Sequence, residues 1–131
     1  YLAVANYRDG SSYNINSKIF KWDVAGTTFV EYQSIATSGA RDWEAFIVDG
    51  IPYLAVANSE ASGVAPAQHN IDSKIFKWDS LGDSFVEFQS ILTSGAYDWE
   101  AFVIDGTPYL AVAEISNSKV FRWSGTSFVE S

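Results

Sequence analysis

The chain is built from a repeated unit, and this repetition constrains its fold more than any other feature of the sequence. Three motifs return in the same order: Tyr-Leu-Ala-Val-Ala at 1–5, 53–57 and 109–113, Ser-Lys-x-Phe-x-Trp at 17–22, 73–78 and 118–123, and Phe-Val-Glu at 29–31, 85–87 and 128–130. A fourth motif, Gly-Ala-x-Asp-Trp-Glu-Ala-Phe, has two copies, at 39–46 and 95–102. The chain therefore holds eleven of the twelve segments that three complete units contain.

Each repeated segment has the composition of a β-strand. The segments are short, rich in Val, Ile, Phe, Tyr and Trp, and bounded by turn residues. Asp49-Gly50 and Asp105-Gly106 predict tight reversals between successive segments. Consecutive strands are therefore expected to pair as antiparallel meanders, and no stretch indicates a long helix.

The length of the unit indicates a β-propeller blade, since four meandering strands in about 45 to 55 residues match one blade. We expect residues 1–36 to form blade one without its first strand, 37–92 to form blade two, and 93–131 to form blade three. The predicted fold is all-β, an open arc of about three four-stranded antiparallel blades. Because a closed propeller has about four to eight blades, closure is expected to need a longer parent chain or a homo-oligomer.

Composition argues against several classes of partner. Eight basic and sixteen acidic residues give a net charge of −8 without any cluster of Lys or Arg, so a phosphate backbone would be repelled and nucleic acid is not an expected partner. No apolar run approaches the roughly 20 residues of a membrane span. The chain has no Cys, which excludes disulfides and thiol chemistry.

The four motifs in this order resemble the EAR repeat, also called the EPTP or epitempin repeat, which is known from the leucine-rich glioma-inactivated proteins and from a large adhesion receptor. The resemblance covers essentially the whole chain apart from its variable loops. It implies a seven-bladed propeller, an extracellular, secreted setting, and protein binding or cell adhesion without catalysis. This chain departs from the family in having too few repeats for a ring and no visible leucine-rich domain.

The Asp-Trp-Glu motif places two carboxylates on one face of a strand. Asp42 with Glu44, and Asp98 with Glu100, are expected about 7 Å apart, near the spacing of paired carboxylates in glycoside hydrolysis. The pair occurs in both copies of the motif, whereas catalytic pockets are rarely duplicated blade by blade. We therefore interpret the motif as structural and predict no catalytic residue and no enzyme.

Asp42 and Asp98 are also the candidate metal ligands. In a propeller they would line the central channel at one level, where carboxylate oxygens suit a hard cation such as Ca²⁺, and the resemblance is consistent with a channel ion. The alternative interpretation is that both side chains accept backbone hydrogen bonds at the starts of strands. No other cofactor is expected.

Partner contacts are expected in the loops that follow the Tyr-Leu-Ala-Val-Ala motif, because loops on a rigid scaffold commonly carry specificity. These loops vary most in length, covering 7–16, 59–72 and 115–117. The candidate partner-binding residues are Arg8, Asp9, Tyr13, His69 and Asn70. The alternative is that the loops vary without binding anything.

Three functions are compatible with this sequence. The first is an extracellular protein-binding or adhesion module. The second is a self-assembling structural protein, in which the open edge left by the missing strand is completed by the next subunit in a ring or filament. The third is a glycan-binding lectin built on the recurring Trp residues, whose expected role is otherwise packing between blades.

Overall fold

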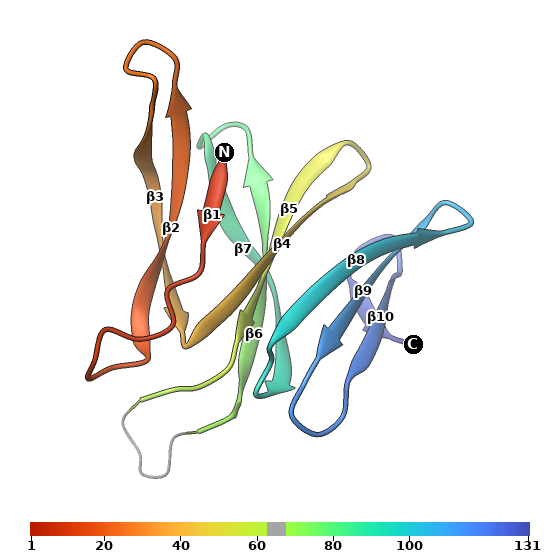
Figure 1. Ribbon diagram of the computed structural model, residues 1–131. Helices are drawn as coiled ribbons and strands as arrows, with labels where there is room; N and C mark the ends of the chain where they lie inside the picture. The colour runs from red at the N-terminus through yellow and green to blue at the C-terminus, as the bar shows by residue number, and fades with distance from the viewer. Residues whose placement is uncertain (63–67) are drawn as a thin grey trace.

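The computed structural model describes residues 1–62 and 68–131 and folds them into three antiparallel sheets (Figure 1). The first contains β1 (Leu2–Val4), β2 (Asn14–Asp23) and β3 (Thr28–Ser38). The second contains β4 (Ala40–Val48), β5 (Ile51–Asn58), β6 (Asn70–Asp79) and β7 (Ser84–Ser94). The third contains β8 (Asp98–Ile104), β9 (Thr107–Ala113), β10 (Lys119–Trp123) and β11 (Phe128–Glu130). No helix occurs in these described ranges, which confirms the all-β prediction.

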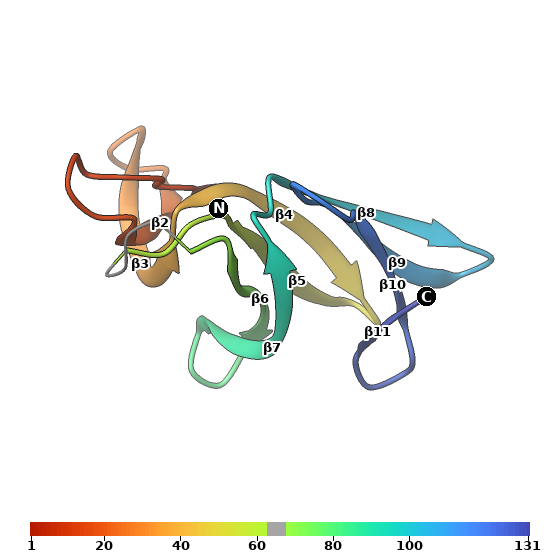
Figure 2. The ribbon, with the colours of Figure 1, turned by 90° about the horizontal axis from the view of Figure 1, so that it is seen from below.

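Each complete sheet is a four-stranded meander, ordered β4-β5-β6-β7 in one and β8-β9-β10-β11 in the other. The Asp-Trp-Glu segment is the first strand of both, as β4 and β8. The first sheet begins instead at β1, which pairs only with β2. Viewed from below, the three sheets stand side by side in an open row (Figure 2). The predicted open arc of about three blades, with the first lacking its first strand, is confirmed.

The tight connections follow from their Asp-Gly pairs. Asp49 and Gly50 have φ values of 51° and 77°, and they join β4 to β5 with Val48 opposite Ile51. Two successive positive φ angles define the hairpin turn whose twist matches that of paired strands, and Asp-Gly adopts it at little cost. Asp105 and Gly106 repeat this geometry between β8 and β9. Sequence and local geometry therefore agree at both turns.

In the first and second blades, a β-bulge directs an aromatic side chain toward the next blade. The register between β2 and β3 shifts at Ile19/Phe20 and leaves Tyr32 without an opposite residue, and the shift at Ile75/Phe76 leaves Phe88 in the same position. The Tyr32 ring lies 6.4 Å from the ring of Trp78 in the next blade, measured between centroids. Bulges commonly redirect side chains in this way, and here they extend the apolar contact between blades.

The hydrophobic core lies between the blades. One cluster joins the first two blades through Ile19, Leu54 and Phe85, and the other joins the last two through Ala55, Trp99 and Phe121. Ala55 and Ala57 are fully buried, so neighbouring sheets approach closely at the small residues of the Leu-Ala-Val-Ala strand. Trp22 is 46% exposed because no blade covers the outer side of the first sheet among the described residues.

A glutamine clamp joins each blade to the next through its outer strand. The Gln33 side chain donates to the Phe85 carbonyl at 2.7 Å and accepts from the Phe85 N–H at 2.9 Å. Gln89 makes the same pair of bonds to Phe128, at 2.8 and 2.9 Å. Because the clamp recurs, the spacing between blades is set by a repeated polar contact as well as by apolar packing.

Candidate partner-binding face

The long loops gather at one end of the blades. The β1–β2, β5–β6 and β9–β10 connections lie there together with the crossovers between blades, which is the lower end of the molecule in Figure 1. We call this the loop end, and the opposite end, with the β2–β3, β4–β5 and β6–β7 turns, the hairpin end. Side chains from all three blades meet at the loop end.

Arg41 is the centre of a cluster at the loop end. Its guanidinium carbon lies 4.3 Å from the centroid of the Tyr7 ring and 4.6 Å from that of Tyr97. The guanidinium also donates to the Tyr7 hydroxyl at 2.9 Å and lies 3.8 Å from a carboxylate oxygen of Glu60. Arg41 is the second residue of β4, Tyr97 precedes β8, and Tyr7 belongs to the β1–β2 connection, so one side chain joins three blades.

Glu60 holds the other side of this cluster. The Tyr7 hydroxyl donates to Glu60 Oε1 at 2.7 Å. Burial, followed by this hydrogen bond to the Glu60 carboxylate, raises the pKa of Tyr7 to about 12. Burial alone would raise the pKa of Glu60, but the hydrogen bond from Tyr7 and the positive charge of Arg41 lower it. Tyr7 therefore stays protonated and Glu60 ionised at neutral pH, which keeps the hydrogen bond in place.

The two long loops also fix each other. The Tyr13 N–H donates to the Ser62 hydroxyl at 2.6 Å, and the Ser62 N–H donates to the Asn14 side chain at 3.3 Å. Ala61 and Gln68 pair across the base of the β5–β6 loop. A surface ordered in advance loses less conformational freedom when it binds, so these contacts suit a binding face.

Sequence reasoning placed Arg8, Asp9 and Tyr13 in the first of these loops. Arg8 is exposed, and its guanidinium carbon lies 5.1 Å from the centroid of the Tyr13 ring, which in turn packs on Tyr7 at 5.2 Å. Asp9 accepts hydrogen bonds from the Ser12 and Ser11 N–H groups at 2.8 and 3.1 Å, and these bonds lower its pKa. Arg8 and Tyr13 thus adjoin the Arg41 cluster, whereas Asp9 orders its own loop.

His69 and Asn70 lie at the end of the second loop. His69 is half-buried, with Nδ1 3.3 Å from the Ser59 carbonyl, and its own carbonyl accepts from the Gly95 N–H at 2.8 Å. Asn70 is exposed at the start of β6. The middle of this predicted partner-binding loop, residues 63–67, lies outside the described residues.

The candidate residues named from sequence did not include Tyr7 and Glu60, which lie in the predicted loops, or Arg41 and Tyr97, which lie outside them. One signal for two of them was present in the repeat itself. Arg41 and Tyr97 occupy the variable position of Gly-Ala-x-Asp-Trp-Glu, which is otherwise identical in its two copies. A position that differs within an otherwise identical motif is one where packing does not require a particular side chain, which indicates the surface. Both residues are exposed.

Asp42 and Asp98, the predicted metal ligands, lie on neighbouring inner strands. Asp42 Oδ2 accepts from the Trp99 N–H at 3.1 Å, and Glu44 Oε1 accepts from the Ala101 N–H at 2.9 Å, so the carboxylates of one blade bond to the backbone of the next. Burial raises the pKa of Asp42, and the nearby charge of Asp98 adds to this effect, against the lowering caused by the Trp99 bond.

The donors present fit a calcium ion only in part. In the described part of the chain, no three His, Cys, Asp or Glu side chains come together as a metal site. Ca²⁺ takes about six to eight oxygen ligands, and one oxygen of Asp42 is already engaged with Trp99. The two side chains could supply ligands to a channel cation only together with water or further donors.

Tandem four-stranded antiparallel sheets, joined by repeated contacts and set in an open arc, define a β-propeller repeat protein. The comparisons with known proteins give the particular family. The EPTP domain model matches residues 28–79 and 84–124, and the chain belongs to this family. The resemblance inferred from the motifs is therefore confirmed.

Curated relatives carry the same repeat. Over 117 residues, 89% of this chain, it is 47% identical to the human "Thrombospondin-type laminin G domain and EAR repeat-containing protein". It is 44% identical to the mouse protein of that name over the same share of the chain. It is 30% identical over 134 residues to mouse "Leucine-rich repeat LGI family member 3", covering 98% of this chain. The chain spans 17% of the length of the first two relatives and 22% of the third.

Residues 1–62 and 68–131 contain no helix that is long and apolar enough to cross a membrane.

Proposed function

We propose that this chain is a non-catalytic protein-binding module of an extracellular, adhesion-type protein, and that its loop end contacts the partner. The observation that carries this proposal is the Arg41 cluster. Arg and Tyr dominate the energetics of protein interfaces, and here a guanidinium is held between the rings of Tyr7 and Tyr97 at a surface to which all three blades contribute.

The composition of the loop end supports a protein partner. Tyr97 is 45% exposed beside Arg41, and Arg8 extends the same surface over Tyr13. A rigid aromatic ring gives a large contact area at a low entropic cost, and a stacked guanidinium adds a directed charge. The extracellular setting rests on the family, since the relatives' names include thrombospondin-type and laminin G domains.

The proposal is tested by measuring binding to an array of purified extracellular domains. The wild-type chain is compared with Arg41→Ala and Tyr97→Ala, and binding to a partner is expected to weaken about tenfold or more in each variant, as for interface hot spots. Arg41→Lys keeps the charge but loses the planar stack, so it is expected to bind nearly as poorly as Arg41→Ala.

A matched control lies at the hairpin end. Leu81 is 98% exposed in the β6–β7 turn, and Leu81→Ser should leave partner binding unchanged. Thermal unfolding establishes that each variant is folded. If Leu81→Ser abolished partner binding while the loop-end variants left it intact, the interface would lie elsewhere and the proposal would be refuted.

Calcium binding remains a second proposal, for the inner strands. Burial is the main cause of the raised pKa of Asp42 and the charge of Asp98 adds to it, and a cation near both carboxylates would offset that repulsion. Isothermal titration of the chain with CaCl₂ measures it directly. The heat of binding is expected to disappear in Asp42→Asn/Asp98→Asn, and an unchanged titration in that variant would exclude this site.

Self-assembly is the alternative function, supported by the uncovered outer sides of the first and third blades. Trp22 and Phe29 are 46% and 47% exposed on one side, and Asp98 and Glu100 are exposed on the other. Sedimentation velocity over a range of concentrations separates the two functions. A monomer at all concentrations contradicts self-assembly, whereas a discrete ring or filament contradicts an isolated binding module.

A further inference from the structure

Two arginines and three tyrosines of the loop end form one continuous stack. The guanidinium carbon of Arg8 lies 5.1 Å from the ring centroid of Tyr13, and the Tyr13 centroid lies 5.2 Å from that of Tyr7. Arg41 continues the row, with its guanidinium carbon 4.3 Å from the Tyr7 centroid and 4.6 Å from the Tyr97 centroid. Because the row crosses three blades, the scaffold holds its members in place, and no single loop does so alone.

The Arg41 guanidinium keeps most of its hydrogen-bonding capacity within this stack. A guanidinium carries several N–H donors in a rigid, planar fork, and here Nη2 donates to the Tyr7 hydroxyl at 2.9 Å. The Glu60 carboxylate, 3.8 Å away, is beyond hydrogen-bond distance and accepts from the Tyr7 hydroxyl instead. No other atom in residues 1–62 and 68–131 accepts a hydrogen bond from Arg41, so the remaining donors are available to a ligand.

Arg41 is both reachable from solvent and held in place. Its side chain is 32% exposed, while the rings of Tyr7 and Tyr97 restrict its motion. A group that is already fixed loses less conformational freedom when it binds. Arg122, in β10, carries the same charge but is exposed and lies outside the stack. The chain therefore contains its own reference for an arginine that is not held by aromatic rings.

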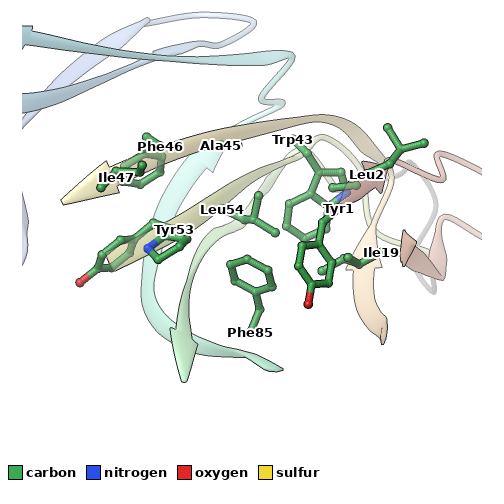
Figure 3. A pocket seen from close by; sticks show the side chains of 12 residues that line it. Tyr1, Leu2, Ile19, Trp43, Ala45, Phe46, Ile47, Tyr53, Leu54 and Phe85 are labelled. Atoms are coloured by element: carbon green, nitrogen blue, oxygen red, sulfur yellow. The ribbon is translucent and has the colours of Figure 1, made fainter. Parts of the chain in front are cut away.

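The cleft between the first and second blades lacks such a group. Figure 3 shows it from close by, with the rings of Tyr1, Trp43 and Phe85 around the space. Its volume is about 440 Å³, and the lining residues within the described part of the chain include no charged side chain. An anion would lose its hydration in this cleft without gaining an opposite charge. An acidic ligand is therefore expected at the loop end and not in the cleft.

We propose that the free N–H groups of the Arg41 guanidinium bind a carboxylate of the protein partner, supplied by an aspartate or glutamate side chain. The planar fork of a guanidinium matches the two oxygens of a carboxylate and forms two parallel hydrogen bonds with it. This inference rests on the proposed function, because it names the chemical group that the loop end recognises.

The charge around the site favours a singly charged ligand. The chain has a net charge of −8, and the Glu60 carboxylate lies 3.8 Å from the Arg41 guanidinium. A phosphorylated side chain carries a charge of about −2, so this negative field repels it more strongly than it repels a carboxylate. A carboxylate thus gains the same pair of hydrogen bonds at a smaller electrostatic cost.

The proposal is tested with two blocked tripeptides that differ in one charge, acetyl-Gly-Glu-Gly-amide and acetyl-Gly-Gln-Gly-amide. Each is added to the ¹⁵N-labelled chain, and the Nε–H signals of Arg8, Arg41 and Arg122 are followed by NMR. Arg41→Lys and Arg122→Lys assign these signals. The Glu peptide is expected to shift the Arg41 signal in a saturable way, at a concentration about tenfold below that needed to shift Arg122. The Gln peptide should leave the Arg41 signal in place.

Two variants change the site in opposite directions. Glu60→Gln keeps an acceptor for the Tyr7 hydroxyl but removes the negative charge beside Arg41. The Glu peptide is expected to bind this variant about threefold more tightly, because less charge repels it. Tyr97→Ala removes one ring from the stack, and the peptide is expected to bind about threefold more weakly. Thermal unfolding establishes that both variants are folded.

Several results would overturn the proposal. They are equal shifts with both peptides, a Glu peptide that shifts Arg122 as readily as Arg41, and weaker binding to Glu60→Gln. Inorganic phosphate that binds Arg41 more tightly than the Glu peptide does would also overturn it. If Arg41→Ala abolished binding to an extracellular domain while the Glu peptide left the Arg41 signal unchanged, this inference would fail and the proposed function would stand. Partner binding that does not depend on Arg41 would instead refute the proposed function.

Discussion

Replacing Trp99 and Trp43 one at a time by Phe tests how much the contacts between blades stabilise the fold. The two residues occupy the same position of the repeat and pack on equivalent rings, with centroids 6.0 Å apart for Trp99 and Phe121 and 5.8 Å for Trp43 and Phe76. They differ in one bond. Trp99 Nε1 donates to the Val56 carbonyl, whereas Trp43 Nε1 is buried without an acceptor.

The expected difference follows from that bond. Trp99→Phe removes a buried hydrogen bond and takes the indole donor from the Val56 carbonyl, which costs about 1–3 kcal/mol, in addition to the lost packing of the larger ring. Trp43→Phe loses packing too, but it also removes a buried donor whose desolvation is uncompensated. Trp99→Phe is therefore expected to lower the free energy of unfolding by about 2 kcal/mol more than Trp43→Phe.

The assay is urea unfolding followed by far-UV circular dichroism, which reports β-structure and is insensitive to the loss of one fluorophore. The slope of the transition should be the same in both variants, so that the shift in midpoint measures stability alone. Equal destabilisation by the two substitutions would show that the indole bond between blades contributes nothing measurable, and the reasoning about the repeat would fail.

Three further predictions concern single contacts. Gln33→Ala leaves the Phe85 N–H and carbonyl without the clamp, and a loss of about 1–3 kcal/mol is expected in the same urea assay; a loss no larger than that of Ser34→Ala, on the exposed neighbour, would contradict it. At Gly39, with φ +54°, an added Cβ would lie 2.8 Å from the Glu60 carbonyl oxygen. At Gly50, with φ +77°, an added Cβ would meet nothing within 4 Å, so Gly50→Ala costs only the backbone strain of about 1–2 kcal/mol. Gly39→Ala should therefore lower the melting temperature more than Gly50→Ala. Because the pKa of Asp42 is raised in the folded state, the folded protein binds this proton at a higher pH than the unfolded chain does, and Asp42 adds to the free energy of unfolding as the pH falls from neutral toward 3.8. Asp42→Asn should remove this increase in stability at acid pH. Identical profiles of stability against pH for the two proteins would contradict the prediction.

Much of the fold follows from local sequence. Period-two strands such as Leu2-Ala3-Val4 and the Asp-Gly turns specify meanders because strand pairing and turn geometry depend on neighbouring residues. The repeated unit of four strands then predicts the blades, and it shows which strand the first blade lacks. The loops of variable length lie at the same end of the molecule as the Arg41 cluster, and the sequence did not indicate Arg41 or Tyr97 as members of such a cluster.

Only the tertiary structure determined the contacts between residues about fifty positions apart in the sequence. The Asp-Trp-Glu carboxylates could be interpreted from sequence as metal ligands or as backbone acceptors, and the bonds from Asp42 to Trp99 and from Glu44 to Ala101 depend on how closely the inner strands approach. The meeting of Tyr7, Arg41 and Tyr97 depends in the same way on the curvature of the arc. Within a blade the repeat determines the structure, because each strand meets its neighbour in sequence. Between blades the result depends on the angle at which whole sheets pack, and that angle is a property of the assembled core.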